Sequence, residues 1–192
     1  MEYNFRFSLT EDDFADFNAY TVWLAPWNKK KKIKFFFRTL VYSIIIMTGI
    51  TYLIDEITSL GQKSNINFRI GLSLGFGLLS ALISYFNTTE RVKKSAKKTL
   101  HGKENQNFLK ETDLRISEAG IFDADKVCSA NYTWISIVKY SVTKQFFYLY
   151  INSIQAIIVP KRLFNSQYEI DEFDKFVTEK IPLLSLFRSI DI

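Results

Sequence analysis

Two apolar stretches, IKFFFRTLVYSIIIMTGITYLI at residues 33–54 and INFRIGLSLGFGLLSALISYF at residues 66–86, decide the fold of this chain. The first carries no charged residue from Thr39 onward, and the second carries none from Ile70 onward. A helix rises about 1.5 Å per residue, so each stretch is long enough to cross a hydrocarbon layer about 30 Å thick. We therefore expect two transmembrane helices.

The alternative is that both stretches are core helices of a soluble domain, because each uncharged run is slightly shorter than a usual membrane span. Their spacing and flanks favour a membrane hairpin instead. Only a short polar segment, residues 55–65, separates them, and basic clusters stand on both outer sides. We expect this hairpin, with its basic flanks, to occupy residues 29–98 and to divide the chain into an N-terminal part, 1–28, and a C-terminal domain, 99–192.

Basic residues are concentrated on the outer sides of the hairpin. The loop between the helices holds Asp55 and Glu56 but only Lys63 as a cation. Positive residues are retained on the cytoplasmic side of a membrane, so we expect both termini in the cytoplasm and the loop outside. The outer clusters are also suited to anionic lipid headgroups. They consist of Lys29, Lys30, Lys31, Lys32, Arg91, Lys93, Lys94, Lys97 and Lys98.

The composition argues against several classes of protein. The formal net charge of +5 comes largely from the clusters beside the hairpin, so we expect no nucleic-acid partner. Cys128 and His101 are the only residues of their types, which excludes an internal disulfide and leaves no basis for a Cys/His metal site. No cleavable signal pattern precedes residue 33, so we expect the first apolar helix to serve as the insertion signal.

The N-terminal part predicts a strand followed by a helix. Apolar and polar residues alternate over Glu2–Thr10, and a lone strand needs a sheet to join, so we expect it at the edge of the C-terminal sheet. Thr10 and the acids that follow predict a helix N-terminus, with the helix at Glu11–Leu24. Trp23 and Trp27 leave two placements open for this amphipathic helix, at the membrane interface or packed on the C-terminal domain.

The second apolar helix carries small residues that let another helix approach closely. Gly71 and Gly75 form a GxxxG pair, and Gly77 with Ala81 forms a second pair of the same spacing. The short loop makes the first apolar helix the favoured neighbour. A second copy of the chain is the alternative, which would make a homo-oligomer.

The C-terminal domain predicts an antiparallel sheet capped by a helix. Short runs rich in β-branched and aromatic residues recur between residues 109 and 159, separated by turn residues, and Pro160 is expected to stop pairing. We expect about five to seven strands, with one of them over Thr133–Val142. Apolar residues at helical spacing then predict an amphipathic helix over Glu169–Lys180. The fold class is thus α+β, with a two-helix membrane hairpin.

The order of a cytoplasmic N-terminal strand and helix, two transmembrane helices, a basic linker and four pieces of the C-terminal domain makes essentially the whole chain resemble the YcxB-like family of small bacterial membrane proteins. The four pieces are LRISEAGIF (114–122), YTWISIVKYSVTKQFFYLYI (132–151), AIIVPKRLF (156–164) and EIDEFDKFV (169–177). The resemblance implies a location in the bacterial cell membrane and a pleckstrin-homology-like fold for the C-terminal sheet domain. It carries over no catalytic residue.

Three residues of the domain are candidates for contact with a protein partner or with lipid: Trp134, Lys161 and Arg162. Each also has a structural interpretation, which we favour. An aromatic residue beside a strand run usually packs on its neighbours, and basic residues after a proline usually lie in a solvated loop. We expect Cys128 to be a small buried apolar residue and His101 to be a solvated linker residue.

No arrangement in the sequence supports catalysis. A hydrolase needs a nucleophile with a base and an orienting partner, and a single histidine in a basic linker does not provide them. We therefore expect no enzyme, no cofactor and no metal. The favoured function is an interaction module at the membrane surface, working through the sheet domain and a protein partner. The alternative is an immunity protein that protects its own cell against a secreted or membrane-active toxin.

Overall fold

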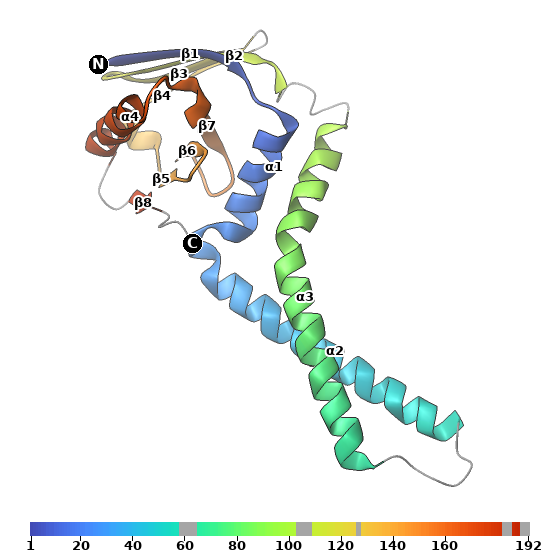
Figure 1. Cartoon of the computed structure of the whole chain (residues 1–192). Helices are drawn as coiled ribbons and strands as arrows, with labels where there is room; N and C mark the ends of the chain where they lie inside the picture. Colours follow the sequence, from blue (N-terminus) through green and yellow to red (C-terminus); the bar gives the residue numbers. More distant parts are fainter. Residues whose placement is uncertain (58–64, 103–108, 126–127, 182–185, 189–192) are drawn as a thin grey trace. The chain divides into compact units, whose positions relative to one another are not determined.

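The computed structural model describes residues 1–57, 65–102, 109–125, 128–181 and 186–188, and it shows a mixed α+β protein with two long apolar helices (Figure 1). The chain forms two compact units. The sheet unit comprises Met1–Pro26 and Lys93–Ile192, and the hairpin unit comprises Trp27–Val92. The N-terminal segment therefore folds together with the C-terminal part of the chain.

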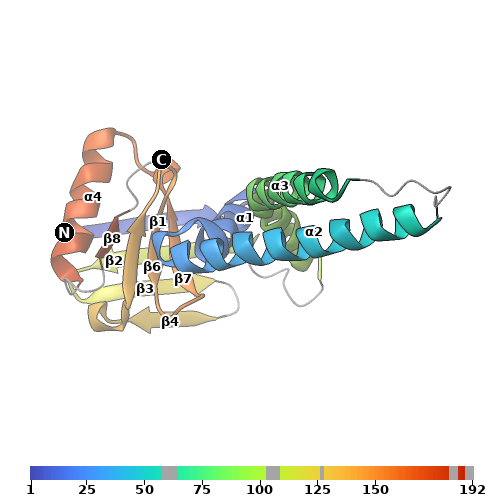
Figure 2. The same cartoon turned by 90° about the horizontal axis from the view of Figure 1, so that it is seen from below.

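The first sheet of the sheet unit is an antiparallel meander that begins with the N-terminal strand (Figure 2). β1 pairs with β2 over its whole length, from Glu2 opposite Ser117 to Ser8 opposite Glu111. The expected pairing of the N-terminal strand with the C-terminal sheet is thus found. The strands, in their order in the sheet, are β1 (Glu2–Ser8), β2 (Glu111–Ser117), β3 (Gly120–Asp125) and β4 (Ser129–Tyr132).

The second sheet differs from the prediction in one pairing. Its strands, in their order in the sheet, are β7 (Ala156–Pro160), β6 (Phe146–Tyr150), β5 (Lys139–Val142) and β8 (Leu186–Arg188). The expected antiparallel pairing is found at every other strand pair of the described residues, but β8 runs parallel to β5, and the strands form two sheets where one was expected. β8 contains only three residues, which is too short a run for alternation to be recognised in the sequence.

The strand predicted over Thr133–Val142 also needs correction. Trp134–Ser136 forms a turn of 3-10 helix, and β5 begins only at Lys139. The indole of Trp134 explains the interruption, because its Nε1–H donates to the carbonyl oxygen of Ser117 at 3.0 Å. A side chain that bonds across to the β2–β3 turn fixes the local backbone outside the β-ladder.

One apolar core lies between the two sheets and helix α4 (Gln167–Lys180), which is close to the predicted Glu169–Lys180. Ser166 caps α4 by accepting from the backbone N–H of Glu169. The core residues come from both sheets and from the helix. They include Phe7, Leu114, Ile116, Ile121, Trp134, Tyr140, Phe147, Leu149, Val159, Phe173, Phe176 and Val177.

Helix α1 (Glu11–Ala19) starts at the predicted cap. The hydroxyl of Thr10 accepts from the backbone N–H of Asp13, and the Asp13 carboxylate accepts from the backbone N–H of Thr10, which completes a capping box. A π-helical turn at Tyr20–Leu24 continues the helix as far as Ala25, where the backbone becomes extended before Pro26. The helical segment therefore ends beside the proline, as expected.

The hairpin unit consists of helix α2 (Lys29–Ile57) and the first part of helix α3 (Ile66–Leu100). Both helices are long and apolar enough to cross a membrane, judged by length and composition. The Ser43 and Ser80 hydroxyls are 2.9 Å apart, and near the loop Arg69 pairs with Asp55 at 2.9 Å. Arg69 therefore has a carboxylate partner at the loop end of the two helices.

The two small-residue pairs of α3 have different neighbours. A Cβ added at Gly77 would lie 2.5 Å from a side-chain carbon of Ile44 on α2, and Ala81 is fully buried. A Cβ added at Gly71 or Gly75 would meet no atom within 4 Å in the described structure. The close approach of the two helices therefore uses Gly77 and Ala81, while the GxxxG pair lies away from this contact.

Candidate functional site

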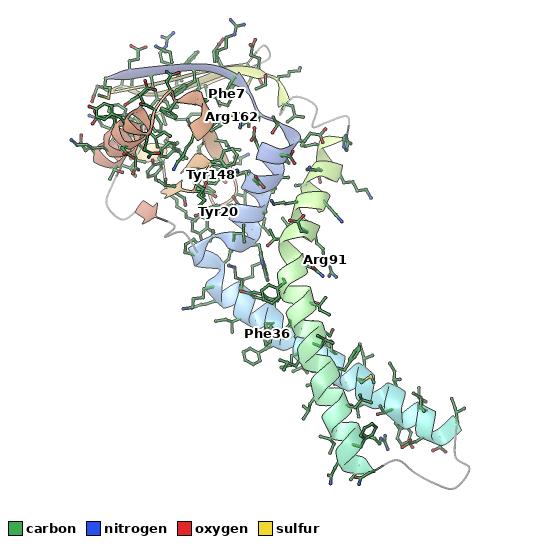
Figure 3. The ribbon with its side chains drawn as sticks, viewed as in Figure 1. Phe7, Tyr20, Phe36, Arg91, Tyr148 and Arg162 are labelled. Carbon is green, nitrogen blue, oxygen red and sulfur yellow. The ribbon has the colours of Figure 1, made fainter. Side chains whose placement is uncertain are left out.

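The outer face of the second sheet is covered by the N-terminal helical segment. Phe17 packs on Tyr148 and Tyr150 with ring centroids 5.5 Å and 6.1 Å apart. The Tyr20 ring lies 5.2 Å from that of Tyr148, and Figure 3 labels these two residues. The Thr21 hydroxyl is 2.7 Å from the Tyr150 hydroxyl. Of the two placements left open for this helix, packing on the C-terminal domain is the one found.

Burial on both faces explains the composition of β6. Phe147 and Leu149 point into the core, whereas Tyr148 and Tyr150 lie under α1 and the π-helical turn, so all of FFYLY is buried. Loss of solvation is the largest cause that raises the pKa of Tyr148 and of Tyr150 above the usual value for a phenol. These tyrosines therefore stay neutral and act as packing and hydrogen-bonding groups.

Arg162 joins the N-terminal helix to the end of β7. Its two terminal nitrogens lie 2.8 Å and 2.5 Å from the two carboxylate oxygens of Asp13, a bidentate pair. Burial by itself would raise the pKa of Asp13, but hydrogen bonds from Arg162 and Thr10, together with the charge of Arg162, lower it overall. Arg162 is thus a candidate contact residue that has a defined structural partner within the chain.

Lys161 and Lys144 lie at a charged hollow next to this pair. The Lys161 ammonium is 4.9 Å from the ring centroid of Phe147, and its backbone N–H donates to the carbonyl oxygen of Gln145 at 2.8 Å. The hollow has a volume of about 380 Å³. Its lining combines carboxylates of α1 with cations from the β5–β6 connection and from the 3-10 turn after β7. The lining residues are Asp12, Asp13, Asp16, Lys144, Gln145, Phe146, Lys161 and Arg162.

Trp134 is a core residue. Its side chain is buried, its ring meets Phe176 edge to face with centroids 5.9 Å apart, and its N–H is satisfied by Ser117. The favoured interpretation of this tryptophan as a packing anchor agrees with that placement. Its side chain is therefore engaged in packing and in one hydrogen bond within the sheet unit.

A charged seam joins α1 to the C-terminal turns of α3 inside the sheet unit. Lys93 pairs with Asp16 at 2.7 Å, and Lys97 pairs with Asp12 at 2.5 Å. Lys94 and Lys98 are exposed on the same helix. The basic stretch after the second apolar helix thus divides into cations that hold α1 and cations that face solvent.

In the hairpin unit, the basic residues at the start of α2 are mostly exposed. Lys29, Lys30 and Lys31 are exposed, Lys32 is half-buried, and Arg91 on α3 is exposed. Their side chains are accessible for headgroup contact, the role that the sequence suggested for them.

The other two residues singled out in the sequence have simple placements. His101 is exposed, 3.9 Å from the Glu11 carboxylate. Cys128 is exposed, so the expectation of a buried thiol was wrong. Cys128 borders the start of β4, where its backbone N–H donates to the Asp125 carboxylate at 2.7 Å. Among the described residues, no group of three or more His, Cys, Asp or Glu side chains is placed to hold a metal ion.

A larger, mostly apolar cavity opens at one end of the sheet unit, between the first sheet, β7 and α1. Its volume is about 460 Å³. Sequence reasoning missed it, because its walls come from segments that are far apart in the chain. We call it the mouth cavity, and its lining includes Phe7, Phe14, Phe17, Lys110, Thr112, Leu114, Asp123, Asp125, Ala130, Tyr132, Ile154, Ile157 and Ile158.

Replacing Arg162 by alanine is expected to destabilise the sheet unit by about 2 kcal/mol at pH 7. Breaking a buried ion pair costs about 3–5 kcal/mol, and we reduce this value because the Arg162 side chain is 47% exposed. Since the native pKa of Asp13 is lowered, the stability that this carboxylate contributes is present above its unfolded pKa and is lost as the pH falls through the native pKa. The deficit of R162A should therefore shrink below about pH 4.

Urea unfolding followed by tryptophan fluorescence, at pH 7 and at pH 3, measures this difference. The matched control is R115A, which removes an exposed arginine 3.6 Å from Glu2 and should change stability little. Equal effects of R162A and R115A at pH 7, or a deficit of R162A that does not depend on pH, would contradict the assignment.

Comparison with known proteins supports the resemblance found in the sequence. The family model described as YcxB-like protein matches residues 116–177, from β2 to α4. No curated protein and no solved structure matches the chain. The resemblance to the YcxB-like family, which we expected over essentially the whole chain, is therefore confirmed over residues 116–177.

Proposed function

We propose that the protein is a non-enzymatic, membrane-anchored interaction module. In this proposal α2 and α3 cross the bacterial cell membrane, both termini lie in the cytoplasm, and the sheet unit binds a protein partner at the membrane surface. The observation that carries the proposal is the position of the hairpin unit in the chain, between two paired strands of one sheet.

The pairing of β1 with β2 constrains the topology. Ser8, at the end of β1, lies opposite Glu111, at the start of β2, so the chain leaves and re-enters the sheet at the same end of one strand pair. A folded sheet cannot span a membrane with an open edge, so both strands belong on one side. The intervening segment must then cross the membrane an even number of times, which two apolar helices satisfy.

The surfaces of α2 and α3 also favour a membrane over a soluble core. Large apolar side chains such as Ile45, Ile46 and Leu79 are each more than half exposed in the structure of the chain alone. Contiguous apolar surface of this extent is rare on soluble monomers. Basic residues are numerous at the outer ends of the two helices and scarce in the loop between them. This distribution supports the placement of both termini in the cytoplasm.

For the sheet unit we propose the pleckstrin-homology-like fold that the family resemblance implies. Two sheets enclose one core, and α4 contributes Phe173, Phe176 and Val177 to it. Two features go beyond the expected antiparallel sheet capped by one helix. β8 pairs parallel to β5, and α1 covers β6. Lys161 at the charged hollow remains a candidate for contact with a partner or a headgroup, and Lys144, which lines the same hollow, joins it as a further candidate.

Reporter fusions in the native membrane, combined with affinity purification, test the proposal. A reporter after Ile192 should be active in the cytoplasm and one inserted at Gly61 should be active outside, while the protein stays in the membrane pellet after alkaline washing. Purification in mild detergent should recover a cytoplasmic protein in stoichiometric amount. A soluble protein or a reversed topology would refute the anchor. A secreted, toxin-like partner would favour the protective role instead.

A further inference from the structure

The mouth cavity has the size and lining of a small-molecule site. Its volume of about 460 Å³ lies within the range of about 300–1,000 Å³ that is usual for ligand pockets. Phe7, Phe17, Leu114 and Ile157 provide buried apolar walls. Ligand sites of this kind combine such walls with a few polar groups that fix the orientation of the ligand.

Asp123 is the polar group that stands out. Along β3 it occupies the same face as Ile121, which is in the core, and it lies opposite Leu114 of β2, which is also buried. The alternation of the strand thus places a carboxylate at an inward position. β3 is flanked by β2 and β4, so this carboxylate does not protect a sheet edge, the usual reason for an inward-pointing charge.

Within the described residues, the hydrogen-bond partner of Asp123 is a neutral group. The Oδ1 atom of Asp123 accepts a hydrogen bond from the Thr112 hydroxyl at 2.7 Å. None of the ion pairs within the described parts of the chain includes Asp123. Asp125 lines the same cavity, and Lys110, which is exposed, is the cation among the described lining residues, so these three residues sum to a charge of −1. A carboxylate in an apolar cavity favours a positively charged ligand.

We propose that the mouth cavity binds a small organic cation, with the apolar body of the ligand among Phe7, Phe17, Leu114 and Ile157 and its ammonium group at Asp123. Charge complementarity selects this occupant over an uncharged lipid chain, which would bring no positive charge to the carboxylate. The site is separate from the charged hollow at Arg162, and its ligand does not depend on the identity of the protein partner.

The test uses the full-length protein in nanodiscs of zwitterionic lipid, with 4-phenylbutylammonium as the probe and 4-phenylbutanol as its neutral counterpart. Saturation-transfer NMR titrations give the two affinities. We expect the ammonium to bind about tenfold more tightly than the alcohol, because a charge-assisted hydrogen bond contributes more than a neutral one. D123N retains an acceptor for Thr112 and should abolish this difference.

Two further variants keep the test decisive. D113N removes a carboxylate from the exposed face of the neighbouring strand β2 and should preserve the tenfold preference. A130L fills the cavity from β4 and should weaken both probes, which separates binding in the cavity from partition into the lipid. The proposal is overturned if wild type shows no saturable binding, if D123N keeps the preference, or if A130L leaves both affinities unchanged.

Discussion

A protein that lacks Met1–Pro26 is expected to lose the fold of its C-terminal sheet domain. β1 supplies one edge of the first sheet and places Phe7 in the core. Phe17 and Tyr20 of α1 and the turn after it cover β6, and Trp23 of the same turn is buried. Fully burying a large apolar side chain is worth about 1.5–3 kcal/mol, so these residues together contribute on the order of 10 kcal/mol. That is comparable to the whole stability of a typical domain, about 5–15 kcal/mol.

The experiment compares two soluble proteins. One joins Met1–Pro26 to Lys93–Ile192 through a Gly/Ser linker in place of the hairpin unit, and the other contains Lys93–Ile192 alone. The linked protein should be soluble, give dispersed NMR spectra and unfold cooperatively. The shorter one should aggregate or remain unfolded until a synthetic peptide of residues 1–26 is added. A shorter protein that folds with the stability of the linked one would show that β1 and α1 are dispensable.

Local periodicity predicted most of the elements correctly. The alternation through Tyr3, Phe5 and Phe7 indicated β1, because one face of that strand is buried and the other is solvated. Thr10 followed by acids marked the start of α1 for a similarly local reason. The capping hydrogen bonds join Thr10 to Asp13, only three residues further along the chain. The two apolar helices follow from composition alone.

The remaining features depend on contacts between distant parts of the chain. Asp13 and Arg162 are 149 residues apart in the chain. The sequence around Asp13 resembles that of any exposed acid in a first helical turn, and the sequence around Arg162 resembles that of any exposed loop arginine. Trp134 lies in a run of β-forming residues, but its bond to Ser117 replaces the strand with a 3-10 turn. One feature of the local sequence points to the mouth cavity. In the β3 sequence GIFDAD, alternation from Ile121 places Asp123 on the inward face, where a carboxylate is unusual.

Replacing Gly120 by alanine is expected to destabilise the sheet unit by more than about 3 kcal/mol, through two independent effects. Gly120 has φ of 140°, a value that residues with a Cβ rarely adopt. An added Cβ would also lie 2.4 Å from the carbonyl oxygen of Tyr132. That oxygen belongs to the backbone of β4, which is paired with β3 and cannot move away without breaking the ladder.

The position of Gly120 makes the damage spread beyond the turn. Gly120 begins β3 opposite Ser117, the residue whose carbonyl oxygen holds Trp134 in the core. Shifting the β4 backbone would therefore loosen the turn and the tryptophan together. Thermal unfolding of G120A, compared with A119G in the same turn, measures the effect, since A119G changes an exposed residue and should cost less than about 1 kcal/mol. Similar midpoints for the two variants would mean that the β4 backbone can yield at this contact.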